Sequence, residues 1–304
     1  MALVPGCKAT VLALLMEALT IIMKFVADFA YAAQPKITPL TIAAFLKYAE
    51  DPYVLENPCR AKQDIALDVL NTIVRNSEAP LPNALIETAF PAVVNCVMHT
   101  DDHTVMVAGG ECLRSFINVS PEQIFSYKNG EGVNYVMQVA TVLLNPMNTE
   151  MTAGGQIVRL GITIITKMGN MLGQTVDMLL KAVISKMQNL ECLKVIMNLV
   201  LIFAHLFLTQ MDAVLNFLST VPGPNGEPAL QFVLTNWLSR QNSFFGAYER
   251  KLTTMALCKL FEYGVATQDN RLTSITYKEM VQEPSGNRVC TRSVASNYQK
   301  FCLG

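Results

Sequence analysis

The chain has 304 residues, of which 51% are hydrophobic and only 15% are charged, and its formal net charge is −1. This is enough apolar material for about two ordinary domains or for one elongated array of repeats. Its eight cysteines occur singly, without a Cys-x-x-Cys pair, which argues against a disulfide framework and is typical of a reduced, intracellular protein.

Two runs are apolar enough to raise the question of a membrane, Val11 to Phe29 and Val195 to Leu208. The first contains three charged residues at helical spacing, and the second has only 14 residues and includes Asn198 and His205. Because a spanning helix needs about 20 mostly apolar residues, we interpret both runs as buried helices and expect no membrane insertion. Glu17 also interrupts the first run, so no secretory signal is predicted.

Taken in order, the chain is predicted to have three parts: residues 1–35, the leading helix or helices of an incomplete repeat; 36–265, an array of about five helical hairpins; and 266–304, a basic, irregular tail. Within the array, helices are predicted over 58–75, across the hairpin 82–119, and over 133–144, 149–168, 174–187, 192–208, 212–218, 228–237 and 248–263. No segment shows sustained strand alternation.

Successive hairpins begin near Lys36, Pro82, Gly132, Gly173 and Pro228, so the repeat is about 40 to 55 residues long. This period matches HEAT and armadillo units better than the shorter tetratricopeptide or ankyrin repeats. Each hairpin buries its apolar stripe only against its neighbours. The predicted fold is therefore all-α, a right-handed α-α superhelix of the HEAT/armadillo solenoid type.

The hairpin 82–119 is the clearest repeat unit. Apolar residues recur at steps of three and four on both of its predicted helices, which places one apolar stripe on each. The connection is short, so the helices fold back as an antiparallel pair, and either Thr100 or Asp101 is predicted to cap the second helix. Pro91 lies inside the first helix, where it costs about 3 kcal/mol unless packing compensates, and a kinked first helix is typical of HEAT repeats.

The sequence offers little for catalysis. It has three histidines and no Gly-x-Ser-x-Gly, phosphate-loop or His-Glu-x-x-His motif, so we predict neither an enzyme nor a cofactor. The pairs Gly109-Gly110 and Gly154-Gly155 are interpreted as places where another helix or a partner approaches closely, with loose helix ends as the alternative. His205 lies in an apolar helix and is interpreted as a satisfied core histidine.

One group of residues has metal-ligand chemistry: Cys96, His99, Asp101, Asp102 and His103. The helix ends between the two histidines, so they need not share a face, and the aspartates are explained by capping and by the favourable field of a helix N-terminus. We therefore interpret the segment as a capped turn between helices and predict no metal site.

Charge is distributed unevenly along the chain. Residues 50–131 contain twelve acidic and five basic residues, a local net charge of −7 that would attract a basic partner in a salt-dependent way. The candidate binding residues lie on or beside second helices, which line the concave face of HEAT arrays, and they are Asp64, Asp68, Asp101, Asp102 and Glu111. The alternative is that these are ordinary solvent-facing charges.

The runs AFPAVVNCVMHTDD, GGECLRSFINV and NYVMQVATVLLNP resemble the last HEAT repeats of the karyopherin-β (importin-β) family of nuclear transport receptors. So do LLKAVISKMQNLECLKVIMNLVLIFAHL, LSTVPGPNGEPALQFVLTNWLSRQ and YERKLTTMALCKLFEYG. The resemblance extends from roughly Pro82 to Ser293, and Arg292 falls in a basic tail segment of that family.

This resemblance implies a receptor that wraps basic cargo, such as core histones and ribosomal proteins, and releases it in response to the small GTPase Ran. It also implies contact with nucleoporins, shuttling between cytoplasm and nucleus, and no direct binding of nucleic acid. The family's N-terminal Ran-binding repeats and acidic C-terminal stretch have no counterpart here, and the residues after Ser293 look unrelated. We therefore expect a C-terminal fragment, a truncated gene model or an isoform, with a HEAT-repeat adaptor that scaffolds a multi-protein complex as the alternative function.

Overall fold

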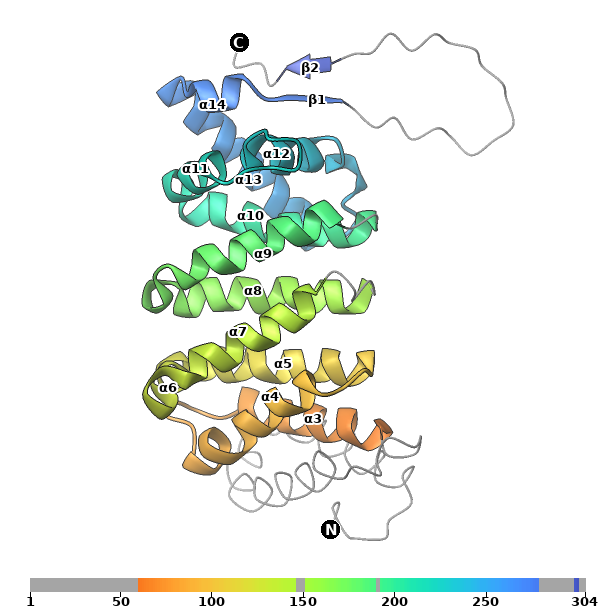
Figure 1. Ribbon diagram of the computed structural model, residues 1–304, viewed down its shortest axis with the longest axis vertical. Coiled ribbons are helices and arrows are strands. Elements are labelled where there is room, and N and C mark those ends of the chain that lie inside the picture. The colour runs from red at the N-terminus through yellow and green to blue at the C-terminus, as the bar shows by residue number, and fades with distance from the viewer. Residues whose placement is uncertain (1–59, 146–150, 190–191, 279–297, 301–304) are drawn as a thin grey trace, which may run out of the picture. The chain divides into compact units, whose positions relative to one another are not determined.

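The fold is given by a computed structural model (Figure 1), which describes residues 60–145, 151–189, 192–278 and 298–300. The predicted leading segment 1–35 and residues 36–59, the predicted start of the array, lie outside these residues. The chain divides into two compact units, Met1–Leu179 and Leu180–Gly304, and each is described by itself.

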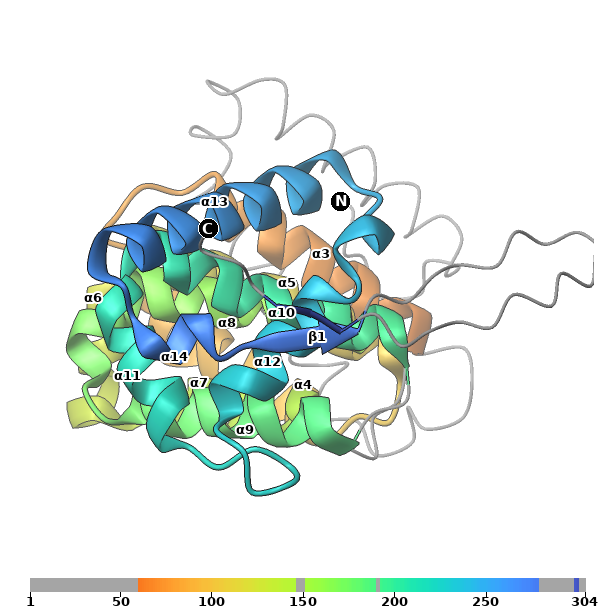
Figure 2. The same cartoon turned by 90° about the horizontal axis from the view of Figure 1, so that it is seen from above.

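The first unit contains two layers of helices. Its elements are α3 (Arg60–Arg75), the π-helical turn η2 (Leu85–Ala89), α4 (Phe90–Met98), α5 (His103–Val119), α6 (Pro121–Ser126), the 3-10 turn η3 (Tyr127–Gly130), α7 (Glu131–Leu144) and α8 (Met151–Leu172). Helices α3, α5 and α8 pack side by side in that order, while α4 packs on α5 and on α7. Figures 1 and 2 show α4 and α7 on one side of this unit and α3, α5 and α8 on the other. First and second helices of successive hairpins thus form separate layers, as predicted for a HEAT-type repeat.

The core of the first unit is built by the apolar stripes of these helices. Phe90 is fully buried and makes edge-on contacts with Phe116 of α5, at 5.8 Å between ring centroids, and with Tyr127, at 5.4 Å. Tyr135 of α7 lies 6.3 Å from Phe90. The aromatic cluster therefore joins α4 to the helices that follow it on both layers.

Pro91 sits at the start of α4, directly after the π-helical turn. In that turn the Phe90 N–H donates to the Leu85 carbonyl, one residue further back than in an α-helix. A proline has no N–H to donate, and its ring clashes with the preceding turn of an ordinary α-helix, so a wider turn at this point accommodates Pro91. The predicted irregularity of the first helix is present, and its form is a π-helical turn.

The second unit is also mainly helical. Its helices are α9 (Thr175–Asn189), α10 (Leu193–Thr209), α11 (Met211–Thr220), α12 (Ala229–Leu238), the 3-10 turn η4 (Gln241–Ser243), α13 (Ala247–Thr267) and α14 (Asn270–Thr273). Two strands follow, β1 (Thr276–Lys278) and β2 (Tyr298–Lys300). The first residues of α9, up to Leu179, are counted with the first unit. Helix α10 packs against α13, and ten of its 17 residues are buried, as its nearly all-apolar sequence predicts. Trp237 of α12 is fully buried, with its ring 6.2 Å from that of Phe207.

Two features of the second unit differ from the expectation of helices followed by irregular chain. The strands β1 and β2 pair antiparallel, and each has only three residues, too few for alternation to be recognised in the sequence. Leu272 of α14 and Ile275 are buried, so part of the segment after residue 266 packs on the unit. The all-α repeat class is confirmed, with this small ribbon added to it.

In the parts of the chain that the structure describes, no helix combines the length and the apolar character needed to cross a membrane.

Candidate functional site

Two of the predicted acidic residues lie on α3. Asp64 is half-buried and Asp68 is exposed, and their spacing of four places them on one face of the helix. The same face borders α5, because the Ser115 hydroxyl donates to Asn71 Oδ1 across the two helices at 2.6 Å. The structure therefore brings the α3 aspartates to the side on which α5 contributes its own polar residues.

Glu111 of α5 is held in a small ion-pair network. Arg114 contacts its Oε2 at 2.7 Å, and Arg159 of α8 approaches its Oε1 at 3.4 Å. Two cations therefore oppose the charge of Glu111, which reduces its attraction for a basic partner. Arg159 is 48 residues away in sequence, so sequence reasoning had no local signal that would reveal this pair.

The two remaining acidic residues lie in the turn before α5. Asp102 is the N-cap: its Oδ1 accepts the backbone N–H of Thr104 at 2.8 Å. The prediction that Thr100 or Asp101 caps this helix is wrong, because α5 begins at His103 and only the preceding residue can reach its first turn. The Thr100 hydroxyl accepts the Asp102 N–H at 3.1 Å and so supports the cap, while Asp101 is exposed.

We expect the Asp102→Ala variant to lose about 1 kcal/mol of stability, because the first turn of α5 loses its capping acceptor. Asp102→Asn keeps an acceptor at the same place and should lose less. Amide exchange of residues 103–106 measures the difference, since the first turn should open more often in the alanine variant. Equal exchange in the alanine variant and the unchanged chain would show that the cap is dispensable.

The residues with metal-ligand chemistry are occupied in other ways. Cys96 is buried on α4, and burial raises the pKa of its thiol to about 11, which disfavours the thiolate that binds metals. His99 Nδ1 lies 2.9 Å from the carbonyl of Asn95. In the described ranges, no group of three or more His, Cys, Asp or Glu side chains is placed to hold a metal ion.

Gly109 permits close packing inside the hairpin. A Cβ atom at this position would lie 2.3 Å from Cγ2 of Val97 on α4, which no real contact allows without movement. The interpretation that another helix approaches here is confirmed for Gly109. Gly154 and Gly155 lie in the first turns of α8, where side-chain surroundings are outside the described residues.

His205 of α10 differs from the satisfied core histidine that was expected. It is half-buried, and its Nε2 atom is buried without a hydrogen-bond partner among the described residues. Burial lowers its pKa below the ordinary histidine value, which favours the neutral ring.

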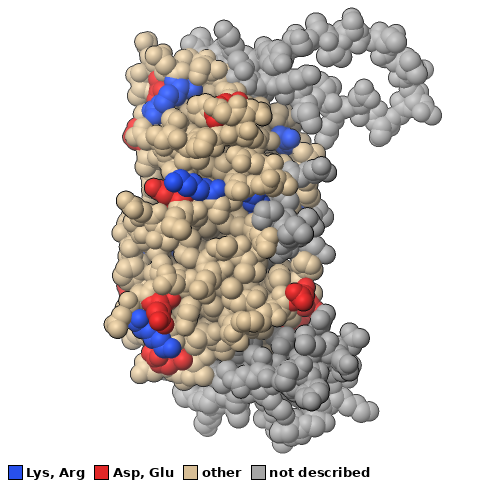
Figure 3. Space-filling model, in the orientation of Figure 1, with Lys and Arg blue, Asp and Glu red and all other residues tan. Residues whose placement is uncertain are grey.

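The acidic side chains of the described residues do not join into a continuous acidic surface on the face drawn in Figure 3. There the acidic and basic residues form small separate groups among large areas of uncharged atoms. Attraction of a basic partner at this face would therefore depend on individual carboxylates.

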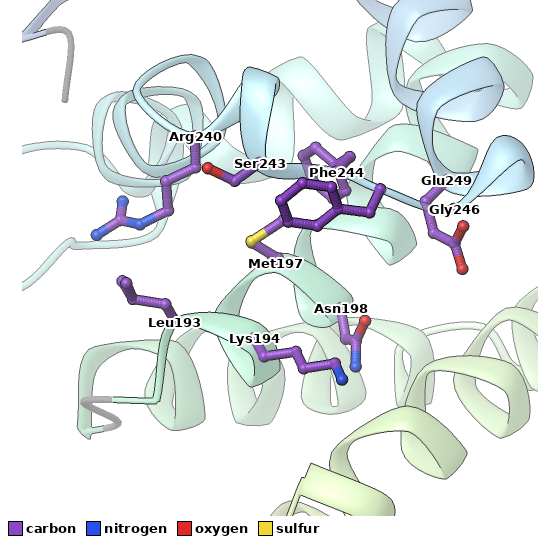
Figure 4. Close-up of a pocket in the computed structure, with 10 residues that line it drawn as sticks. Leu193, Lys194, Met197, Asn198, Arg240, Ser243, Phe244, Gly246 and Glu249 are labelled. Carbon is purple, nitrogen blue, oxygen red and sulfur yellow. The ribbon is translucent and has the colours of Figure 1, made fainter. Parts of the chain in front are cut away.

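A pocket that no sequence pattern indicated lies within the second unit. It has a volume of about 420 Å³ and opens between the start of α10, the connection from α12 to α13 and the first turn of α13 (Figure 4). Its lining includes Leu193, Lys194, Met197, Arg240, Phe244 and Phe245. It was missed because its residues come from segments nearly fifty residues apart, none of which carries a motif.

Comparison with known proteins agrees with this architecture. The family model described as "Importin-11-like, TPR repeats" matches residues 63–281. Importin-9 of Drosophila melanogaster is 73% identical to the chain over 337 residues, which cover 99% of this chain and 33% of that protein. The chain thus spans about a third of the length of this relative.

Because the similarity covers 99% of the chain, it extends beyond the interval Pro82 to Ser293, and the expectation that the last residues are unrelated is wrong. With most of its length matched by one family model and its helices arranged as stacked repeats, the chain belongs to the importin-11-like family.

Proposed function

We propose that the chain is part of a nuclear import receptor that binds basic protein cargo, such as core histones and ribosomal proteins. The observation that carries this proposal is the family match over residues 63–281, supported by 73% identity to a protein named Importin-9. The receptor would act by binding alone, with its cargo exchange regulated by Ran, and would contact nucleoporins as it shuttles between cytoplasm and nucleus.

The cargo surface that we propose consists of Asp64, Asp68, Asp101, Asp102 and Glu111. These residues do not contribute equally. Asp68 and Asp101 are exposed, whereas Asp102 caps α5 and Glu111 is opposed by two arginines. Their exposure makes Asp68 and Asp101 the two carboxylates of this set that a basic cargo can approach most directly.

Reversing both exposed charges, in the variant Asp68→Lys/Asp101→Lys, should weaken the binding of labelled core histones by about tenfold at low ionic strength, or about 1.4 kcal/mol. The loss should shrink at higher salt, because exposed charges are screened. Fluorescence anisotropy titrations at two salt concentrations measure both effects.

Glu262→Lys/Asp177→Lys is the matched control, since it reverses the same number of charges at exposed positions of α13 and α9 that lie outside the proposed surface. Equal affinity for the Asp68→Lys/Asp101→Lys variant and the control would remove the two aspartates from the cargo surface. An import assay with the complete protein in permeabilised cells tests the function itself. Cargo that is bound but never accumulates in nuclei would favour the adaptor alternative.

A further inference from the structure

The pocket in the second unit has an apolar interior and apolar side chains at its mouth. Phe244 is 4% exposed and Met197 is half-buried, so both belong to its inner wall. Leu193 is 48% exposed and Phe245 is 80% exposed, although both are large apolar residues that border the pocket. A volume of about 420 Å³ lies in the range of pockets that hold small ligands or inserted side chains.

Two cations lie at this pocket. Lys194 is exposed on the first turn of α10, and Arg240 follows the end of α12. Nη1 of Arg240 donates to the Asn236 carbonyl and to Asn236 Oδ1, which fixes the guanidinium in place. Its Nε atom is buried and has no hydrogen-bond partner in the described part of the chain. Burial also lowers the pKa of Arg240, because part of the water around the guanidinium is removed.

Glu249 is the acidic residue of the pocket lining, and it does not neutralise Arg240. Its carboxylate lies over Gly246, so close that a Cβ atom there would be 1.5 Å from Oε2. Gly246 is the N-cap of α13, so the carboxylate lies at the favourable end of its own helix. Figure 4 shows Met197 between Arg240 and Leu193 on one side and Glu249 on the other. The Arg240 end of the rim therefore remains positive, and Lys194 places a second positive charge near Asn198, below Met197 in Figure 4.

We propose that this pocket binds a short peptide segment that carries a bulky apolar side chain next to carboxylates. The apolar side chain would enter beside Met197 and Phe244, and the carboxylates would contact Lys194 and Arg240. A basic segment would be repelled by the same two cations. The pocket thus selects an acidic segment, whereas the cargo surface proposed on the first unit selects a basic one. The peptide proposal does not depend on the cargo proposal.

The test uses the whole chain and synthetic ten-residue peptides with a fluorescent label. The acidic probe has Phe-Leu at its centre and glutamates on both sides. Matched probes replace the glutamates by glutamine or by lysine, or replace Phe-Leu by Ala-Ala. We expect the acidic probe to bind in the range of about 10–100 µM and the other three at least about tenfold more weakly.

Two variants remove the pocket's contribution without opening the core. Lys194→Glu reverses an exposed charge at a helix N-terminus, where an acidic residue favours the helix, and Phe245→Ser shortens an exposed side chain. Each variant should lower the affinity for the acidic probe by at least about fivefold. Lys251→Glu and Tyr248→Ser change exposed residues of α13 that do not line the pocket, and they should leave binding unchanged.

Three results would overturn the proposal: equal binding of the acidic and glutamine probes, binding that survives both pocket variants, or no binding of the acidic probe at millimolar concentration. A change of oligomeric state in Lys194→Glu or Phe245→Ser would also overturn it and would identify a second copy of the chain as the occupant. Histone binding serves as the separate readout. It should be unchanged in the pocket variants, so failure here is distinguishable from failure of the proposed function.

Discussion

Replacing Phe90 by alanine should lower the free energy of unfolding of the first unit by about 3–5 kcal/mol, the cost typical of deleting a fully buried aromatic side chain. The ring of Phe90 is completely buried and lies within 6.3 Å of three other aromatic rings. These rings come from α5, η3 and α7, so the cavity left by the substitution would open between both layers of helices. A neighbouring ring that moved into this cavity would leave a second cavity at its own place.

Amide exchange of α4, α5 and α7 measures this effect locally, which matters because a chain of two units need not unfold in one step. Exchange in these helices should accelerate together. Phe261→Ala is the control, because that ring is 41% exposed on α13 and its loss should cost far less. Equal protection in Phe90→Ala and Phe261→Ala would show that the aromatic cluster does not hold the two layers together.

The hairpin 82–119 shows how far the sequence predicts this fold. Apolar spacing of three and four predicts both helices correctly, and the short polar connection predicts their antiparallel packing. Apolar spacing does not locate the first residue of α5 to within one position. The sequence therefore predicts a cap at Thr100 or Asp101, whereas the structure shows that Asp102 caps the helix. A helix is predicted from the spacing of many residues, whereas the position of its cap depends on a single residue.

Contacts between repeats were beyond the reach of the sequence. Gln123 of α6 accepts the backbone N–H of Leu81 at 2.6 Å and donates to its carbonyl at 3.1 Å, so one side chain holds the loop before the hairpin. The Glu111–Arg159 pair and the pocket of the second unit likewise join segments far apart in the chain. Their partners are set by which faces meet when hairpins stack, and helical period alone does not specify that.

Lys186 of α9 carries the clearest pH dependence that the structure predicts. Its side chain is 1% exposed, and burial lowers the pKa of its ammonium from 10.5 to about 8. Between these values the unfolded chain binds more protons at this group than the folded chain does, so the stability of the folded state rises with pH across that window. Below about pH 8 the lysine is charged in both states, and the full cost of burying the charge is present.

The shift from 10.5 to about 8 corresponds to about 3 kcal/mol. The variant Lys186→Met keeps a long side chain and removes the charge, so its unfolding free energy minus that of the unchanged chain should fall by about this amount between pH 8 and 10.5. Trp237, the single tryptophan and fully buried in the same unit, reports the transition by its fluorescence. Groups that titrate in both proteins cancel in the difference.

The control variant Lys181→Met changes an exposed lysine of the same helix. Its unfolding free energy minus that of the unchanged chain should stay constant over this pH range. A flat difference for Lys186→Met as well would mean that the Lys186 ammonium stays as well stabilised in the folded chain as in water, and that its burial has no energetic cost.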